Sequence, residues 1–127
     1  MNFTFNPQRG LLVVQVELWG PTGSGIVSLA LDTGATTSLV NQSRLIQLGY
    51  DPAAESNRVQ ITTGSGVEFV PRITISKLAA LGQDRTNFPV LAHTLPPSAG
   101  IDGLLGLDFF RGHQLVIDFT SGQIQVI

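Results

Sequence analysis

The most informative part of the sequence is Leu29-Ala30-Leu31-Asp32-Thr33-Gly34-Ala35-Thr36-Thr37-Ser38-Leu39-Val40. It combines an apolar strand, an acidic residue, a turn of small residues and a second apolar strand. A carboxylate at the end of a buried strand is costly unless hydrogen bonds or a function hold it there. Thr33 offers a hydroxyl to support Asp32, and Gly34 allows the backbone to approach a bound molecule closely. We therefore take Asp32 as the first candidate for chemistry.

On its own, Asp-Thr-Gly is compatible with more than one interpretation. In the simplest, Asp32 only accepts hydrogen bonds from the amides of a turn between two strands. A second possibility is the phosphate loop of actin-like and sugar kinases, which resembles Asp32-Thr33-Gly34 followed by Thr36-Thr37-Ser38. Those proteins need two large domains that close on a nucleotide, and 127 residues cannot supply them. The rest of the chain has to distinguish the remaining interpretations.

Hydrophobic periodicity on either side of this segment indicates β structure. Leu12, Val14, Val16 and Leu18 alternate with more polar neighbours, as expected for a half-buried strand. A Gly-rich connection at residues 20–25 leads into the apolar run 26–31, so we expect these two segments to pair as a hairpin. The sequence predicts further short strands at residues 58–62, 67–70, 72–76, 89–92, 115–119 and 123–127.

Helix signals are few. Asn41 is a suitable N-cap for one short helix, which Gly49 ends, and a second is predicted at residues 107–111 before Gly112. Residues 95–100 are predicted to form a loop inside the domain. The sequence thus predicts an all-β fold over residues 1–127, a single, small, closed and mostly antiparallel domain with one or two short helices.

Composition excludes several classes of function. The chain has 127 residues, no cysteine, a net charge of −2 and 43% hydrophobic residues. Without cysteine it has no disulfide, thiol nucleophile or zinc knuckle. Its seven Lys and Arg residues are scattered, whereas a nucleic-acid-binding surface needs a basic stripe. No apolar run approaches the length of a membrane span, and no signal peptide is recognisable, so we expect a cytoplasmic protein that binds neither nucleic acid nor membrane.

Three motifs in order resemble the retroviral-like (retropepsin-type) aspartic proteases, in particular their single-domain bacterial members. Residues 31–35 match the catalytic loop of that family, with Asp32, Thr33, Gly34 and Ala35. Residues 61–67 lie where its flap hairpin is expected, with Thr63, Gly64, Ser65 and Gly66 at the tip. Residues 102–110 contain the apolar-apolar-Gly segment Leu104-Leu105-Gly106, which in the family packs beneath the catalytic loop. Residues 115–126 resemble the terminal hairpin of the bacterial and ubiquitin-linked members.

The resemblance implies a small closed antiparallel β-barrel and an aspartic endopeptidase that needs no cofactor and no metal. Hydrolysis of this type requires two carboxylates around one water, one acting as base and the other as acid. The chain has one Asp-Thr-Gly, and it is too short for two lobes. A homodimer that places Asp32 next to its symmetry mate supplies the second carboxylate, as in the family. The partners expected are therefore a second copy and an extended peptide or protein substrate.

The sequence departs from the viral members in two places. Thr36 stands where many of them carry an acid used for substrate and dimer contacts, so that ion pair is not expected here. The flap also lacks the very Gly-rich tip of the viral enzymes. A non-catalytic peptide-binding module with the same fold remains the alternative function.

Other polar residues have simpler expected roles. His93 and His113 are not in metal-ligand spacing, so we expect ordinary surface or loop positions. Asp102 and Asp108 are expected to cap the turn and the short helix beside them. Asp118 is expected to lie in a hairpin turn. No serine is placed with histidine and acidic partners as in a serine hydrolase.

Overall fold

The first long hairpin forms where the alternating pattern predicts it. In the computed structural model, which describes all residues from Met1 to Ile127, β2 (Val13–Gly20) pairs antiparallel with β3 (Gly23–Leu31). Val14 lies opposite Leu29 and Val16 opposite Val27, and all four are buried. Because side chains alternate between faces along a strand, this register directs one apolar row of each strand into the core.

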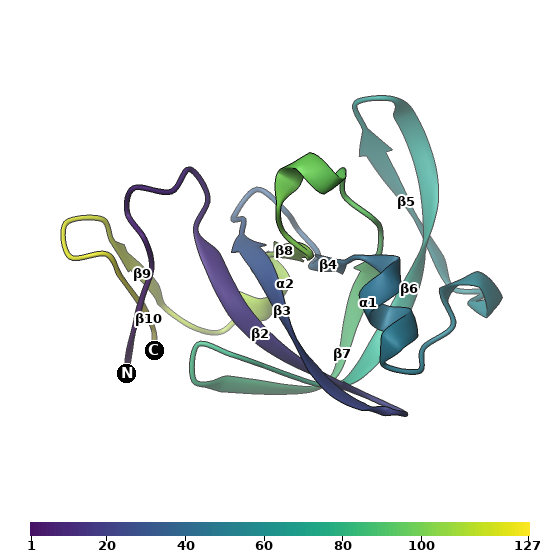
Figure 1. The fold of residues 1–127 in the computed structure, drawn as a ribbon, viewed down its shortest axis with the longest axis horizontal. Coiled ribbons are helices and arrows are strands. Elements are labelled where there is room, and N and C mark those ends of the chain that lie inside the picture. Colours follow the sequence, from purple (N-terminus) through teal and green to yellow (C-terminus); the bar gives the residue numbers. More distant parts are fainter.

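Six strands close into a barrel (Figure 1). Their order is β2-β3-β8-β4-β7-β6, and pairing of β6 with β2 completes the ring. The other strands are β4 (Leu39–Val40), β5 (Arg58–Thr63), β6 (Gly66–Ala80), β7 (Gln83–Ala92) and β8 (Gly103–Leu105). Neighbours are antiparallel except β3 with β8 and β4 with β7. The expected small, closed, mostly antiparallel β fold is confirmed.

Strands β6 and β7 are longer than the sequence predicted. The separate strands expected at residues 67–70 and 72–76 are one strand that runs through Pro71. Pro71 lies where the ladder with β5 ends and the ladder with β7 begins, a position at which a missing backbone N–H is tolerated. Likewise, β7 begins at Gln83, well before the expected start at Pro89. Pro71 therefore lies where β6 changes its pairing partner, and Pro89 lies within β7. The expected strand break at Pro71 and the expected strand start at Pro89 were both wrong.

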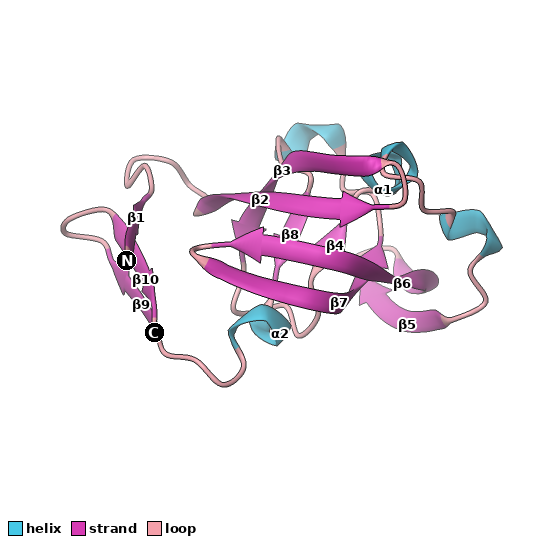
Figure 2. Ribbon diagram, turned by 90° about the horizontal axis from the view of Figure 1, so that it is seen from below, coloured by secondary structure: helices cyan, strands magenta, loops and turns pink.

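The helical segments are short, and they lie outside the barrel wall (Figure 2). They are α1 (Gln42–Gln47), the 3-10 turns η1 (Pro52–Ala54) and η2 (Pro97–Ala99), and α2 (Leu107–Phe110). Gly49, with φ of +93°, follows α1 and ends it as expected. Asn41 precedes α1, but its side chain does not cap the helix, so that prediction was wrong. Neither helix is long and apolar enough to cross a membrane.

A second, three-stranded sheet joins the two ends of the chain. Its order is β1 (Asn2–Thr4), β10 (Gln123–Val126) and β9 (Leu115–Asp118), with both termini on it (Figure 1). The sequence predicted β9 and β10, each one residue longer, but not β1. The hairpin turn contains Asp118, whose carboxylate accepts the N–H groups of Thr120 and Ser121. Its expected role in a turn is confirmed.

The core lies inside the barrel and extends beneath α2. Phe109 is fully buried, and its ring meets those of Phe88 and Phe110 edge to face. Arg85 stacks its guanidinium on Phe109 and donates a hydrogen bond to the Phe109 carbonyl. Partial burial lowers the pKa of Arg85. This packing fixes α2 directly after the segment that supports the candidate site.

Candidate active site

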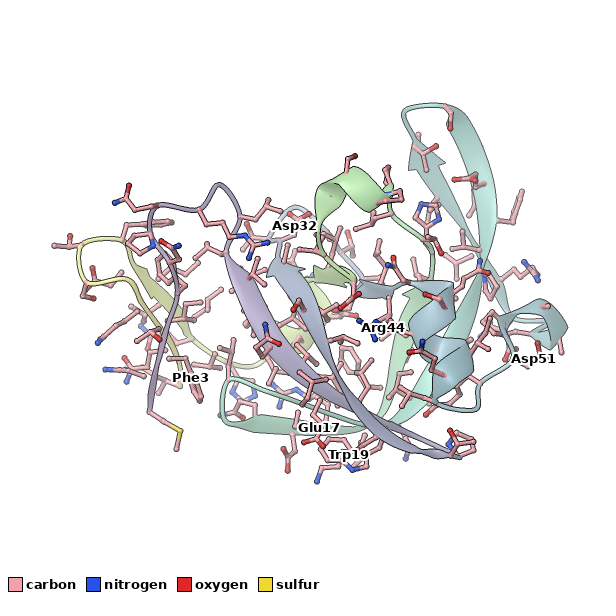
Figure 3. All side chains as sticks on the ribbon, in the orientation of Figure 1. Phe3, Glu17, Trp19, Asp32, Arg44 and Asp51 are labelled. Atoms are coloured by element: carbon pink, nitrogen blue, oxygen red, sulfur yellow. The ribbon has the colours of Figure 1, made fainter.

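Asp32 follows β3 at the start of a tight, hydrogen-bonded loop (Figure 3). Its N–H donates to the carbonyl of Leu105 at 2.9 Å, and its carbonyl accepts from Ala35 at 3.2 Å. Gly34 donates its N–H to Asp32 Oδ1 at 2.8 Å, and a Cβ at Gly34 would lie only 3.0 Å from that oxygen. The side chain is half-buried, and Oδ2 has no hydrogen-bond partner within the chain. One carboxylate oxygen is thus held while the other is available to a ligand.

Thr33 and Ala35, on either side of Gly34, differ in how they contact the rest of the chain. Thr33 is exposed, and its hydroxyl makes no hydrogen bond within the chain. Ala35 is half-buried and accepts a hydrogen bond from Leu107 N at 2.8 Å. The loop is therefore anchored through its backbone at Ala35, whereas the Thr33 hydroxyl is free to contact another molecule.

Ser38 and Asp108 hold the base of the loop. Ser38 is completely buried; its Oγ donates to Asp108 Oδ1 at 2.7 Å and accepts from Gly106 N at 2.9 Å. Its N–H donates to Asp108 Oδ2 at 2.9 Å. Asp108 thus mainly binds a residue seventy positions earlier and, apart from a bond to Phe109 N, does not cap α2. The expectation that Asp108 caps the helix was wrong, because the fold brings the two donors of Ser38 to its carboxylate.

Gly103 and Gly106 let the supporting segment cross beneath the loop. A Cβ at Gly106 would lie 2.6 Å from the carbonyl oxygen of Ala35, and one at Gly103 would overlap the Leu39 carbonyl. Between them, Leu104 pairs with Ala30 and Leu105 with Leu31 in the parallel ladder of β8 with β3. The structure therefore places Leu105 and Gly106 directly against the Asp32 loop, while Leu104 pairs with Ala30 and Leu39 in the strands on either side of it.

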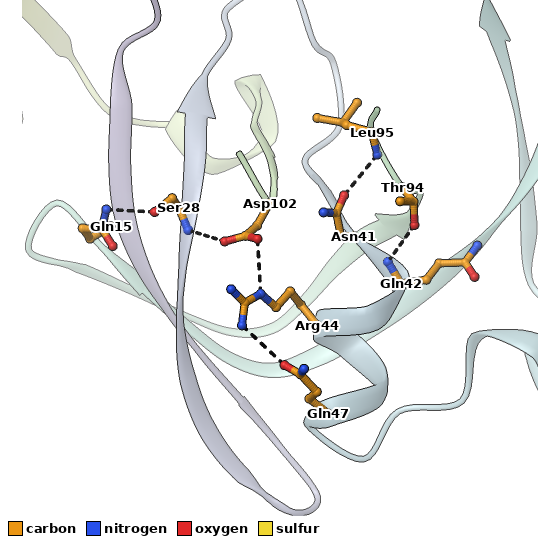
Figure 4. Close-up of polar contacts among 9 residues, drawn as sticks. All are labelled: Gln15, Ser28, Asn41, Gln42, Arg44, Gln47, Thr94, Leu95 and Asp102. Atoms are coloured by element: carbon orange, nitrogen blue, oxygen red, sulfur yellow. Dashed lines mark hydrogen bonds and ion pairs between the residues drawn. The ribbon is translucent and has the colours of Figure 1, made fainter. Parts of the chain in front are cut away.

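Asp102, before this segment, also has a different role from the one expected. Its Oδ2 accepts from Ser28 N at 2.9 Å, and its Oδ1 accepts from Arg44 Nε at 3.2 Å. It connects β3 to α1 and does not cap a turn, so that expectation was wrong as well (Figure 4). Sequence reasoning could not find either partner, because both are more than fifty residues away.

The predicted tip residues lie at the end of the hairpin formed by β5 and β6. This hairpin projects beyond the barrel (Figure 1), with Thr63 paired to Gly66 across a turn of Gly64 and Ser65. Thr63 Oγ1 accepts from Ser65 N at 3.3 Å and donates to Gly66 O at 3.2 Å. Gly66 has φ of +127°, a conformation that favours glycine.

A hollow of about 570 Å³ lies between the Asp32 loop and the β5–β6 hairpin. Three parts of the chain line it. They are the Asp32 loop with β4, the β5 strand of the hairpin, and the end of β7 with the segment that follows it. The lining residues are Ala35, Thr36, Thr37, Leu39, Val59, Gln60, Ile61, Thr62, Thr63, Leu91, His93 and Leu95. His93 and Leu95 were not expected to face a site. No motif marked them, because their position depends on a contact between β4 and β7 that only the fold provides.

Comparisons with known proteins agree with this geometry. The sequence profile of a family described as aspartyl protease matches residues 14–109. A retropepsin-like aspartic protease from Rickettsia conorii has a similar structure, with a TM-score of 0.74 and 17% identity over 99% of this chain and 89% of that one. The EIAV protease, in complex with the inhibitor HBY-793, gives a TM-score of 0.59 and 19% identity over 86% of this chain and 92% of that one. A search of curated protein sequences finds no match.

Proposed function

The chain belongs to the aspartyl protease family, and from that premise we propose that it is an aspartic endopeptidase whose active site is shared by two copies of the chain. The observation that carries the proposal is the state of Asp32. It lies in a loop fixed by backbone hydrogen bonds, with Oδ2 free, and Ala35 to Thr37 of the same loop line a hollow bounded by a hairpin. A carboxylate presented in this way is suited to bind and activate a water.

The need for a second copy follows from the positions of the other acids. The two acidic residues of the supporting segment are both engaged: Asp102 with Ser28 and Arg44, and Asp108 with Ser38. Moving Asp108 to the water would leave the buried Ser38 hydroxyl without its acceptor, which is costly, and moving Asp102 would break its ion pair with the half-buried Arg44. A twofold homodimer supplies the second carboxylate as Asp32 of the partner subunit.

In the proposed mechanism the two Asp32 carboxylates share one proton and hold a water between them. One carboxylate takes a proton from the water as it attacks the peptide carbonyl, and the other gives its proton to the developing oxyanion or leaving nitrogen. The exposed Thr33 hydroxyl would bond across the dimer axis and orient the loop. The tip residues 63–66 would act as a flap over the substrate, which binds extended along the Gly34 backbone and the hairpin.

Cleavage of an unfolded protein at acidic pH tests the proposal. Wild-type chain should cut the substrate internally, and Asp32→Asn should lose activity by about a thousandfold or more, because an amide cannot shuttle the proton. The variant should keep the wild-type circular dichroism spectrum and oligomeric state. Wild-type chain that binds peptides as a monomer without cleaving them would instead favour the non-catalytic binding module.

A further inference from the structure

Helix α2 is a single turn that the rest of the chain has to hold in place. It spans Leu107–Phe110, and a helix this short is not stable by itself in water. No side chain caps its start at Gly106. Its backbone nevertheless supports the Asp32 loop, because Leu107 N donates to the carbonyl of Ala35 at 2.8 Å. The contacts that fix α2 therefore also fix the loop.

Arg85 of β7 binds the second half of this turn, which lies next to that strand (Figure 2). Its Nη2 donates a hydrogen bond to the carbonyl oxygen of Phe109 at 2.8 Å, and its guanidinium carbon lies 4.5 Å from the centre of the Phe109 ring. The Phe109 carbonyl accepts no backbone N–H, so Arg85 is its one partner within the chain. Because a planar guanidinium can stack and donate at once, Arg85 ties α2 to the barrel wall through both a side chain and the backbone.

The first half of α2 meets the base of the Asp32 loop. Asp108 accepts the hydroxyl of Ser38 at 2.7 Å and the N–H of Ser38 at 2.9 Å, and Gly106 N donates to the same hydroxyl at 2.9 Å. Ser38 and Phe109 are both fully buried, so close packing leaves neither of them room to shift independently. A displacement of α2 that begins at Phe109 is thus transmitted to the loop.

We propose that Arg85 is a positioning residue of the proposed active site, which acts on Asp32 through α2. Arg85 does not line the hollow, so we expect no direct contact with the substrate. Its contacts with Phe109 set the position of α2, and α2 holds the loop through Leu107 and Asp108. A small displacement of a reacting group lowers the rate of the chemical step. The inference rests on the proposed function, because it concerns the position of the same carboxylate.

Replacing Arg85 by methionine tests the inference. Methionine keeps an unbranched apolar side chain in the space of the arginine stem, but it removes the donor to the Phe109 carbonyl. For an internally quenched peptide, kcat should fall by about tenfold while KM stays within about twofold of the wild-type value. A transition-state mimic with a central hydroxyl should bind about tenfold more weakly, because its affinity depends on the same geometry. A wild-type kcat, or a rise in KM that accounts for the whole loss of kcat/KM, would overturn the inference.

Two further variants show whether the hydrogen bond carries the effect. Arg85→Lys keeps the positive charge and an N–H donor, and it should return kcat to within about threefold of the wild-type value. Lys77→Met is the matched control, because Lys77 also stacks on an aromatic ring, 4.6 Å from the centre of Trp19, and pairs with Asp84 at 3.6 Å, away from α2. Its kcat should stay within about twofold of the wild-type value. If Lys77→Met lowers kcat as much as Arg85→Met, or Arg85→Lys restores nothing, the role given to Arg85 is wrong.

Hydrogen exchange separates this inference from the proposed function. The exchange rates of the Asp32 and Leu107 amides are measured by NMR in the wild type and in both methionine variants, with circular dichroism as the check of folding. Arg85→Met should raise both rates by about tenfold, whereas Lys77→Met should leave them within about twofold of the wild-type values.

The two measurements together decide between the proposals. If the wild type cleaves no peptide but these amides respond to Arg85→Met, the protease proposal fails and Arg85 still positions the loop. If peptides are cleaved and the amides do not respond, the Arg85 inference fails alone. If neither result is obtained, both are overturned. Should Arg85→Met fail to fold, Arg85→Gln takes its place in every measurement, because its polar side chain is too short to reach the Phe109 carbonyl.

Discussion

Ser38 shows how one buried hydroxyl holds the candidate catalytic residue in place. It is the one fully buried polar side chain of the chain, and it bonds to both the acidic side chain of Asp108 and the backbone of Gly106. Through Gly106 and the adjoining strand β8, this contact reaches Leu105, whose carbonyl accepts the N–H of Asp32. The position of the Asp32 loop is therefore maintained by residues that lie beneath it and do not line the hollow.

Replacing Ser38 by alanine should lower the free energy of unfolding by about 2 kcal/mol. The change leaves Gly106 N without its acceptor and removes one donor from Asp108, and each unsatisfied buried group costs about 1–3 kcal/mol. Chemical denaturation measures the effect. Ser24→Ala is the control, because the Ser24 hydroxyl bonds to Glu17 on the surface and its loss should change stability by less than about 0.5 kcal/mol. Equal stability of the two variants would contradict the role given to Ser38.

At the scale of single residues, the sequence predicted those whose role is local. The loop position of Asp32 was predicted from its own neighbours, and that of Asp118 from the turn that it begins. Asp102, Asp108 and Asn41 were placed wrongly, since each has a local capping role available and takes a distant partner instead. A capping preference describes an isolated helix end, and tertiary contacts override it.

At the scale of structural elements, the β5–β6 hairpin projects beyond the barrel, and the shape of its tip depends on one glycine. Its inner side carries Val59 and Ile61 toward the hollow, and its tip turns at Gly64 and Ser65 before Gly66. The positive φ at Gly66 is a conformation that other residues adopt only with strain. The shape of the tip therefore depends on Gly66 more than on its neighbours.

Replacing Gly66 by alanine should lower kcat/KM by about tenfold, because backbone strain of about 1–3 kcal/mol distorts the part of the hairpin that is proposed to cover the substrate. Thermal unfolding of the whole chain should change little, since the tip is exposed. Gly64→Ala is the matched control: Gly64 has no positive φ, and a Cβ there meets nothing within 4 Å. If both variants cleave peptides as fast as the wild type, the tip does not act as a flap.

The turn between β9 and β10 makes a pH-dependent contribution to the stability of the fold, through Asp118. Hydrogen bonds from Ser121 and then from the N–H of Thr120 hold the pKa of the Asp118 carboxyl below its usual value. The charged form is thus favoured in the folded state, so its stabilising effect is complete above the unfolded pKa of about 3.9 and is lost as the pH falls through the lower folded value.

The Asp118→Asn variant should therefore be less stable than the wild type at pH 7, with the difference shrinking below about pH 4. Thermal unfolding of both proteins at a series of pH values measures this. A difference in melting temperature that stays constant from pH 7 to pH 2 would show that the charge of Asp118 does not stabilise the turn.

Strands with alternating patterns could be predicted, whereas strands defined by their partners could not. β2 and β3 form where periodicity places them. β1 has only three residues and is a strand because it pairs with β10, more than one hundred residues later. β8 is likewise short, and it is formed by its two neighbours, β3 and β4. Such strands lack a local period, so only the closed barrel and the terminal sheet define them.

At the scale of the whole molecule, the barrel is complete but the proposed active site is half of one. The closure of β6 on β2 leaves no open edge in the ring of six strands. Asp32, in contrast, is proposed to need a second carboxylate from a partner chain, because Asp102 and Asp108 of the supporting segment are engaged elsewhere. The central claim is that two chains each contribute one Asp32 to a single site.

Mixing wild-type chain with the Asp32→Asn variant tests this claim most directly. The two are unfolded together in equal amounts and refolded, so that subunits pair at random. The activity of the mixture is compared with that of a sample that contains only wild-type chain at the same total chain concentration. If both Asp32 residues are required, only dimers of two wild-type chains cleave the peptide, and about one quarter of the activity should remain. If each chain acts by itself, about one half should remain, and that result would contradict the shared site.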